Sequence, residues 1–345
     1  MAWSTPNRER RVLKAGHSSI AVTLPKPWAE AMNLRPGDLV VFDQNEDGSL
    51  YLKPAPAPGT VTPGVPYLVQ ARTFDTPGVL ERLVFGAYRV GHDAIEIRSD
   101  LPLPAERREE LQRTARRLLG VSVVAQEPNR VVLQSFVDPT KYELPQLVQR
   151  TKMILLAHLE EAEAHLRGGR PKRTVSLSEE ANRVLSLMIR QLSLASRDWS
   201  LARRIGSPDA RQLLDWRIVV HVLDEIGQLL GELLRELQEG TGPARRDDSP
   251  LAELLGQFKA ELKAVVELLM RPSLSAASET VSEVAQLAVA TRAAARKLKA
   301  STRKTGVYGA MVALGRAADG LTFLSKVALD RAVSAGSGAV LDVGP

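Results

Sequence analysis

The feature that most constrains this chain is a change in the spacing of its apolar residues near residue 141. From there to about residue 333, apolar side chains recur with the 3.6-residue period of amphipathic helices. Breaks rich in glycine, proline and charge divide this stretch into six expected helices: 141–168, 176–206, 208–239, 249–271, 274–300 and 303–333. The longest break follows the third helix. We therefore expect a helical domain at 141–333 made of two three-helix repeats, 141–239 and 249–333.

The chain before residue 141 has shorter elements separated by turn residues. Strands and one short helix are expected up to residue 54, with turns at Gly16, at Pro36-Gly37 and at Asp47-Gly48. The run "PAPAPGTVTPGVP" comes next, and its prolines fix φ and prevent strand pairing. Strands and helices then alternate to residue 137. The expected domains are a β-rich module at 1–54, a linker at 55–66, a small α+β domain at 67–137 and, after the helices, a disordered tail at 334–345.

Composition excludes several classes of protein. The chain of 345 residues contains no cysteine, so disulfides, thiolate metal sites and cysteine nucleophiles are excluded. No window holds the roughly 18 uncharged apolar residues of a membrane helix, and the opening "MAWSTPNRERR" lacks the apolar stretch of a signal peptide. We therefore expect a cytoplasmic protein without a transmembrane segment.

Motifs for catalysis are also missing from the sequence. No phosphate-binding loop of the Walker type and no Gly-x-Gly-x-x-Gly run occurs, and the five histidines share no metal-ligand spacing. The serines of "VSLSEEANR" have no general base close in sequence. We therefore expect a protein that is not an enzyme and carries no cofactor.

Positive charge is concentrated at the amino end of the chain. The net charge is +6, and the residues that precede and form the first turn include four cations and two further hydrogen-bonding side chains: Arg8, Arg10, Arg11, Lys14, His17 and Ser18. Such a group suits phosphate oxygens and base edges of nucleic acid. The alternative is that these cations decorate a solvated amino-terminal arm.

The module that carries this charge is too small to fold stably as a single copy. A unit of fewer than about 50 residues with few aromatics buries little apolar surface, and its strands leave open edges. Pairing with a second copy would cover the edges and place two sets of the cations on one face. The sequence therefore favours a homodimer with double-stranded DNA as its partner.

The stretch "RRVLKAGHSSIAVTLPKPWAEAMNLRPGDLVVFDQNEDGSLYLKP" resembles the swapped-hairpin modules of the AbrB (SpoVT/AbrB) family, which bind DNA as interlocked dimers. The shared features are the Gly-x-Ser turn, the "VTLPK" strand exit, the "LRPGD" turn and the hairpin "DGSLYLKP". The resemblance implies a swapped-hairpin β-barrel and assigns DNA contacts to the six side chains just named. His17 stands where Asn is commoner in the family. Some family members are antitoxins, so the resemblance alone does not imply which promoter the protein would bind.

The helical half resembles a PhoU domain, and the order of the three parts is similar to that of archaeal-type phosphate uptake regulators. The segments "GAYRVGHDAIEIRSD", "ARRLLGVSVVAQE" and "ANRVLSLMIRQLSLA" carry the middle part of this resemblance. It implies a multidomain α+β chain with all-α tandem three-helix bundles at its end. The implied function is a dimeric transcriptional regulator of inorganic phosphate uptake whose helical domain receives the signal.

PhoU domains bind metal clusters through carboxylates four residues apart on a helix, and those positions are eroded in this sequence. Ser178 and Asn182 stand where two carboxylates would be, Gln228 follows Asp224, and Asp319 has a glycine four residues before it. Since each site keeps at most one carboxylate, we expect no metal cluster.

A basic run on the later helices suggests another partner surface. Its members are Arg292, Arg296, Lys297, Lys299, Arg303 and Lys304. Such a run could meet an acidic protein, a phosphate-bearing ligand or lipid headgroups, or be a solvated helix face. The alternative function is an adaptor that contacts a phosphate transporter or a sensor kinase without binding DNA. A metal-binding storage or sensing protein is a third hypothesis.

Overall fold

The structure is a computed structural model of the whole chain, and it divides into two compact units, 1–62 and 63–345. It describes residues 9–44, 48–55, 66–71, 76, 78–169, 174–240, 250–298 and 306–336. Several expected features lie outside these ranges: Arg8, Asp47, most of the linker, Lys299, Arg303, Lys304 and most of the tail.

The first unit consists of short strands and one helix. Its elements are β1 (Leu13–Ala15), β2 (Ser19–Ala21), α1 (Lys26–Ala31), β3 (Val40–Gln44) and β4 (Leu50–Pro54). β1 pairs antiparallel with β2, and β3 with β4, which gives two separate two-stranded sheets. The described residues of one chain therefore form two hairpins and not a closed barrel.

Two of the expected turns depend on glycine. Gly16 has φ of +78° and Gly37 has φ of +99°, in the left-handed region that a side chain with a Cβ rarely adopts. The second turn is held by a hydrogen bond of 2.7 Å from the Arg35 amide to the Asp38 carboxylate. Both turns expected from the sequence are confirmed.

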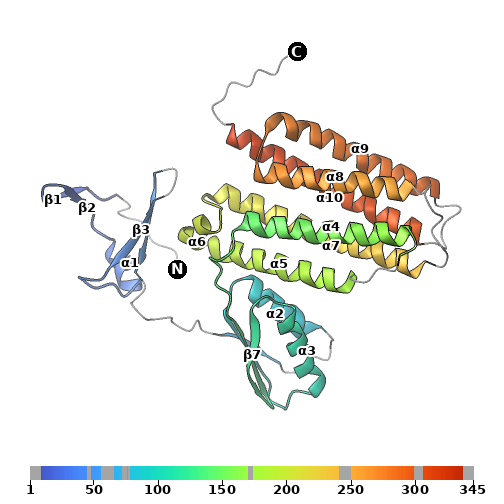
Figure 1. Cartoon of the computed structure of the whole chain (residues 1–345). Coiled ribbons are helices and arrows are strands. Elements are labelled where there is room, and N and C mark those ends of the chain that lie inside the picture. The colour runs from blue at the N-terminus through green and yellow to red at the C-terminus, as the bar shows by residue number, and fades with distance from the viewer. Residues whose placement is uncertain are drawn as a thin grey trace. The chain divides into compact units, whose positions relative to one another are not determined.

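The second unit begins with a small α+β part. Its elements are β5 (Tyr67–Gln70), α2 (Val79–Arg89), β6 (Ala94–Arg98), α3 (Ala105–Arg116), β7 (Val121–Glu127) and β8 (Arg130–Ser135). The strand order is β5-β6-β8-β7, with β5 parallel to β6 and the other pairs antiparallel. The helices α2 and α3 lie beside the sheet (Figure 1) and share a buried core with it.

In the described part of the second unit, seven helices follow. They are α4 (Leu144–Leu166), α5 (Thr174–Ala195), α6 (Trp199–Arg204), α7 (Ala210–Glu239), α8 (Pro250–Met270), α9 (Leu274–Leu298) and α10 (Val307–Ala335). Figure 1 shows the six long helices side by side, with α8, α9 and α10 forming one group. α7 packs against α10 and α4 against α8, so a single apolar core runs through both groups.

The mixed α+β composition and the mostly helical carboxyl half are confirmed. None of the described helices is long and apolar enough to cross a membrane.

One expected helix, 176–206, is wrong, because the structure has two helices there. α5 ends at Ala195, and Asp198 begins α6 as its N-cap. The Asp198 carboxylate accepts hydrogen bonds from the backbone amides of Ser200, at 2.9 Å, and Leu201, at 3.4 Å. These bonds satisfy amides that the first turn of a helix leaves free, so the chain restarts instead of continuing.

A buried arginine joins the α+β part to the helices. Arg190 of α5 is 1% exposed, and its Nη1 donates to the backbone carbonyls of Tyr88, at 2.9 Å, and His92, at 2.8 Å. Its Nη2 contacts the Asp93 carboxylate, and its guanidinium lies 5.0 Å from the centre of the Tyr88 ring. Burial raises the pKa of Tyr88 to about 12. These contacts fix the end of α2 against α5.

Candidate functional site

The side chains expected to contact DNA lie on one hairpin of the first unit. Lys14 sits in the middle of β1, opposite Ile20 of β2, and His17 and Ser18 form the turn between the strands. Arg11, Lys14, His17 and Ser18 are exposed, and Arg10 is half-buried. The hairpin therefore presents several donors within a few residues of one turn, an arrangement that suits a phosphate backbone.

Large apolar side chains of the same unit are also exposed. Ile20 is 77% exposed, Leu39 76%, Leu50 63% and Phe42 60%. No side chain described between residues 9 and 55 is buried. Burying one large apolar side chain stabilises a fold by about 1.5–3 kcal/mol. A single copy of this unit lacks that stabilisation for each of these four side chains. Exposed apolar surface of this kind is typical of a site of protein–protein contact.

The second unit brings the eroded metal positions together. Ser178 and Asn182 of α5 and Asp224 and Gln228 of α7 line one hollow of about 260 Å³, together with Arg117. Asp319 is not among them; its carboxylate contacts the guanidinium of Arg292 on α9. Four of the five positions expected from the sequence therefore form one polar site.

An arginine from the α+β part reaches this same face of α5. Arg89 Nη2 donates to Asn182 Oδ1, at 3.2 Å, and to Ser186 Oγ, at 3.1 Å. Burial lowers the pKa of Arg89, Asp224 raises it, and Arg217 lowers it further. A guanidinium next to these positions repels a metal cation. Within the described ranges no group of three or more histidines, aspartates or glutamates could hold a metal ion.

The basic run expected on the later helices is described only in part. Arg292 is engaged by Asp319, whereas Arg296 and Lys297 are exposed at the end of α9. The remaining three members lie outside the described residues.

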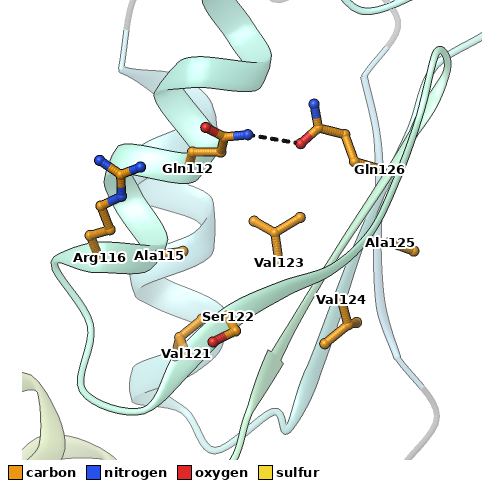
Figure 2. Close-up of a pocket in the computed structure, with 9 residues that line it drawn as sticks. All are labelled: Gln112, Ala115, Arg116, Val121, Ser122, Val123, Val124, Ala125 and Gln126. Atoms are coloured by element: carbon orange, nitrogen blue, oxygen red, sulfur yellow. Dashed lines mark hydrogen bonds between the residues drawn. The ribbon is translucent and has the colours of Figure 1, made fainter.

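A further hollow, of about 460 Å³, lies between α3 and the edge strand β7 (Figure 2). Gln112 and Gln126 point toward one another across it, and Gln112 Nε2 donates to Gln126 Oε1 at 3.0 Å. Of its nine lining residues only Arg116 is charged. The two glutamine amides are hydrogen-bonded to each other, which leaves Arg116 as the one charged group. This hollow therefore has few polar groups that could bind a ligand together.

Sequence reasoning missed three arginines that line the polar site or the hollow adjoining it: Arg82 and Arg89 of α2, and Arg117, the residue after α3. Arg82 and Arg89 are seven residues apart, a spacing that places them on one face of a helix. That spacing was the available signal. No signal in the sequence indicates that Arg89 contacts α5, because Arg89 and Asn182 are 93 positions apart in the chain.

Comparison with known proteins identifies the first unit only. Residues 13–59 match the family model described as "Antidote-toxin recognition MazE, bacterial antitoxin". No curated protein and no solved structure matches the chain. The match ends well before the helical half, so the PhoU resemblance of that half rests on sequence patterns alone. Residues 13–59 thus carry a MazE/AbrB-like domain of the antitoxin type, and domains of this kind bind DNA and oligomerise.

Proposed function

We propose that the chain is a dimeric DNA-binding regulator in which two amino-terminal modules interlock and hold a duplex. The observation that carries this proposal is the exposed apolar surface of the first unit beside its cationic hairpin. In this proposal the chain acts by binding and not by catalysis, and its second unit receives a signal.

Interlocking would meet two needs of the first unit at once. Each two-stranded sheet has outer strand edges whose backbone groups lack strand partners within it, and strands from a second copy can pair with such edges. The same contact would remove Ile20, Leu39 and Phe42 from water. A swapped-hairpin barrel built by two chains explains why one chain shows only separate hairpins.

The dimer would bind DNA mainly through its cations. Arg10, Arg11 and Lys14 would contact phosphates in each copy, with Arg8 adding to them, while His17 and Ser18 at the turn can reach base edges or phosphate oxygens. Each phosphate contact releases a counterion, so the affinity should fall steeply as salt rises.

For the signal, we propose phosphate status, with regulation of phosphate uptake as the outcome. The support is the similarity in the order of parts to archaeal-type phosphate uptake regulators. A second candidate is an antitoxin, which the printed name of the matching family favours. A neighbouring gene for a phosphate transporter supports the first, and a neighbouring toxin gene supports the second.

A DNA-binding assay on the full chain tests the proposal. Fluorescence anisotropy with labelled fragments of the promoters in its genome would be measured at several salt concentrations. We expect Arg10→Ala with Arg11→Ala to weaken binding at least tenfold. Two copies lose four cations in total, so the slope of log affinity against log salt should become shallower by up to about 3.6.

The matched control is Arg296→Ala with Lys297→Ala, which removes the same charge from exposed positions of α9. This control should bind DNA like the wild type. Unchanged affinity in the Arg10 and Arg11 double variant contradicts the proposal. Absence of DNA binding together with loss of a partner protein in the α9 variant would support the adaptor alternative.

A further inference from the structure

A cationic groove lies where the α+β part of the second unit meets the helices. It consists of two adjoining hollows, of about 260 and 320 Å³, which share Arg117 and Asn182. Volumes of this order suit a small ligand. The walls come from α2, from Arg117 directly after α3, and from α5 and α7. The charged lining residues are Glu81, Arg82, Arg89, Arg117 and Asp224.

Two of the arginines pack against the same aromatic ring. The guanidinium carbons of Arg89 and Arg117 each lie 5.5 Å from the centre of the Phe85 ring. Arg82, which is exposed, lines the same hollow. Arginines that line one hollow repel each other, and an anion bound in that hollow would relieve the repulsion.

The two carboxylates of the groove do not accept hydrogen bonds from all the arginine N–H groups around them. Glu81 contacts Nη1 of Arg117, yet Arg117 Nε is buried and has no hydrogen-bond partner in the described part of the chain. Arg89 directs Nε and Nη2 to α5, and its donation to Asn182 Oδ1 orients that amide so that Nδ2 remains a donor. Three arginines and two carboxylates therefore line the groove, and Arg117 Nε is a donor that no described acceptor uses.

Another hollow of the second unit lacks this excess of positive charge. The one between α4 and α5, of about 550 Å³, is lined by two arginines and two glutamates, and Arg150 pairs with Glu180 at 2.8 Å. The hollow of Figure 2 has a single charge. The groove between α2, α3, α5 and α7 thus gathers three arginines, more than either of these two hollows.

We propose that this groove binds a small phosphoryl oxyanion, inorganic phosphate or a phosphate ester, between Arg82, Arg89 and Arg117. Guanidinium forks match the oxygens of such an anion, and the Asn182 amide supplies a neutral donor. Because α2 and α3 belong to the α+β part and α5 and α7 to the helices, the anion would tie the two together. The inference rests on the proposed function in that it names a ligand for the unit that receives the signal.

Calorimetric titration of the full chain without DNA tests the site. Inorganic phosphate and pyrophosphate are added at constant ionic strength, with sodium chloride as the blank. We expect saturable binding, tighter for pyrophosphate because its two phosphoryl groups can reach more than one arginine. Arg82→Ala and Arg117→Ala should each weaken binding at least tenfold.

Two further variants separate binding from folding. Arg116→Ala removes the same charge from the neighbouring position of α3, which faces the other hollow (Figure 2), and should bind like the wild type. Asp224→Asn removes a carboxylate from the groove and should tighten binding severalfold, a gain that a misfolded variant cannot show.

Three results overturn the site: no saturable binding of either anion, equal losses in the Arg116 and Arg117 variants, or weaker binding in Asp224→Asn. The proposed function fails by a different measurement. Anion binding can be absent while the promoter assay still shows salt-dependent DNA binding, and the reverse result leaves the groove in place.

Discussion

The two units of the chain differ in where they keep their apolar side chains. In the second unit Trp216 is 1% exposed and Phe258 is fully buried, and one core runs through six long helices. In the first unit no side chain described between residues 9 and 55 is buried. The second unit therefore carries its stability within one chain, whereas we expect the stability of the first to depend on assembly.

Arginine serves the two units in opposite ways. In the second unit Arg190 is buried against backbone carbonyls, and the guanidinium of Arg331 lies 4.5 Å from the centre of the Trp216 ring. In the first unit Arg11 and Lys14 are exposed on a hairpin. A cation that joins elements within a fold is not available to a partner, whereas the exposed Arg11 and Lys14 are.

The largest effect is expected when the units are separated. Residues 63–345 should keep the main thermal transition of the full chain, with a midpoint that does not depend on protein concentration, because their cores are complete. Residues 1–62 should unfold at a midpoint that rises with concentration. Circular dichroism over a hundredfold range of concentration measures both. A cooperative, concentration-independent transition in residues 1–62 would contradict the comparison.

A second prediction concerns the internal use of arginine. Arg190→Met should lower the free energy of unfolding of the second unit by about 3–5 kcal/mol, because the carbonyls of Tyr88 and His92 lose their buried donor. The control is Arg197→Met, an exposed residue of the segment after α5 that donates to the Val90 carbonyl at 2.8 Å. It should cost less than about 1 kcal/mol. Urea denaturation followed by fluorescence gives both values, and equal losses would sink the assignment.

Local features of the fold could be predicted from the sequence, and long-range contacts could not. The period of the apolar residues locates the long helices, and Gly16 and Gly37 locate turns that need left-handed backbone. The break before α6 was missed because an apolar period continues across it, although an aspartate at 198 is a typical N-cap. The period of the apolar residues indicates where a single helix runs, but it does not indicate which other elements that helix contacts.

The candidate sites show the same division. The cationic hairpin is contiguous in sequence, so its side chains were predicted together. The groove depends on Arg89 meeting α5, 93 positions away, and Arg190 meets its partners across about 100 positions. Nothing in a single sequence records such distances. The eroded positions on α5 and α7 were named only through a family resemblance, which gave no hint of the arginines beside them.

A third prediction tests the exposed apolar surface of the first unit. Ile20→Glu should prevent assembly, because burial of each isoleucine is worth about 1.5–3 kcal/mol and both copies would lose it. Light scattering after gel filtration should show the dimer shifting to monomer, with DNA affinity at least tenfold weaker. Met153→Glu is the control, since Met153 is 61% exposed on α4 of the second unit. If both variants keep the wild-type mass, the apolar face of the hairpin is not an interface.

The smallest effect concerns a charge held inside the sheet of the second unit. Glu96 is 4% exposed, and its Oε1 accepts hydrogen bonds of 2.6 Å from Nε of Arg98 and from Nε of Arg130. The bond from Arg98, followed by that from Arg130, lowers the pKa of Glu96. A lowered pKa stabilises the fold above the usual glutamate value of about 4.3, and this contribution is lost as the pH falls through the folded-state pKa.

Glu96→Gln should therefore cost about 1 kcal/mol at pH 7, a modest value because both arginines are partly solvated. The gap to the wild type should begin to close as the pH falls below the usual glutamate value of about 4.3, and should vanish as the pH passes the lowered pKa of the folded protein. Urea denaturation between pH 3 and pH 7 checks this. Glu109→Gln is the control, because Glu109 is exposed and lies 3.8 Å from Arg113; it should show almost no gap at any pH. A gap for Glu96→Gln that stays constant down to pH 3 would mean that the side chain acts through packing, and that the internal pairing of charges in the second unit contributes less than its geometry implies.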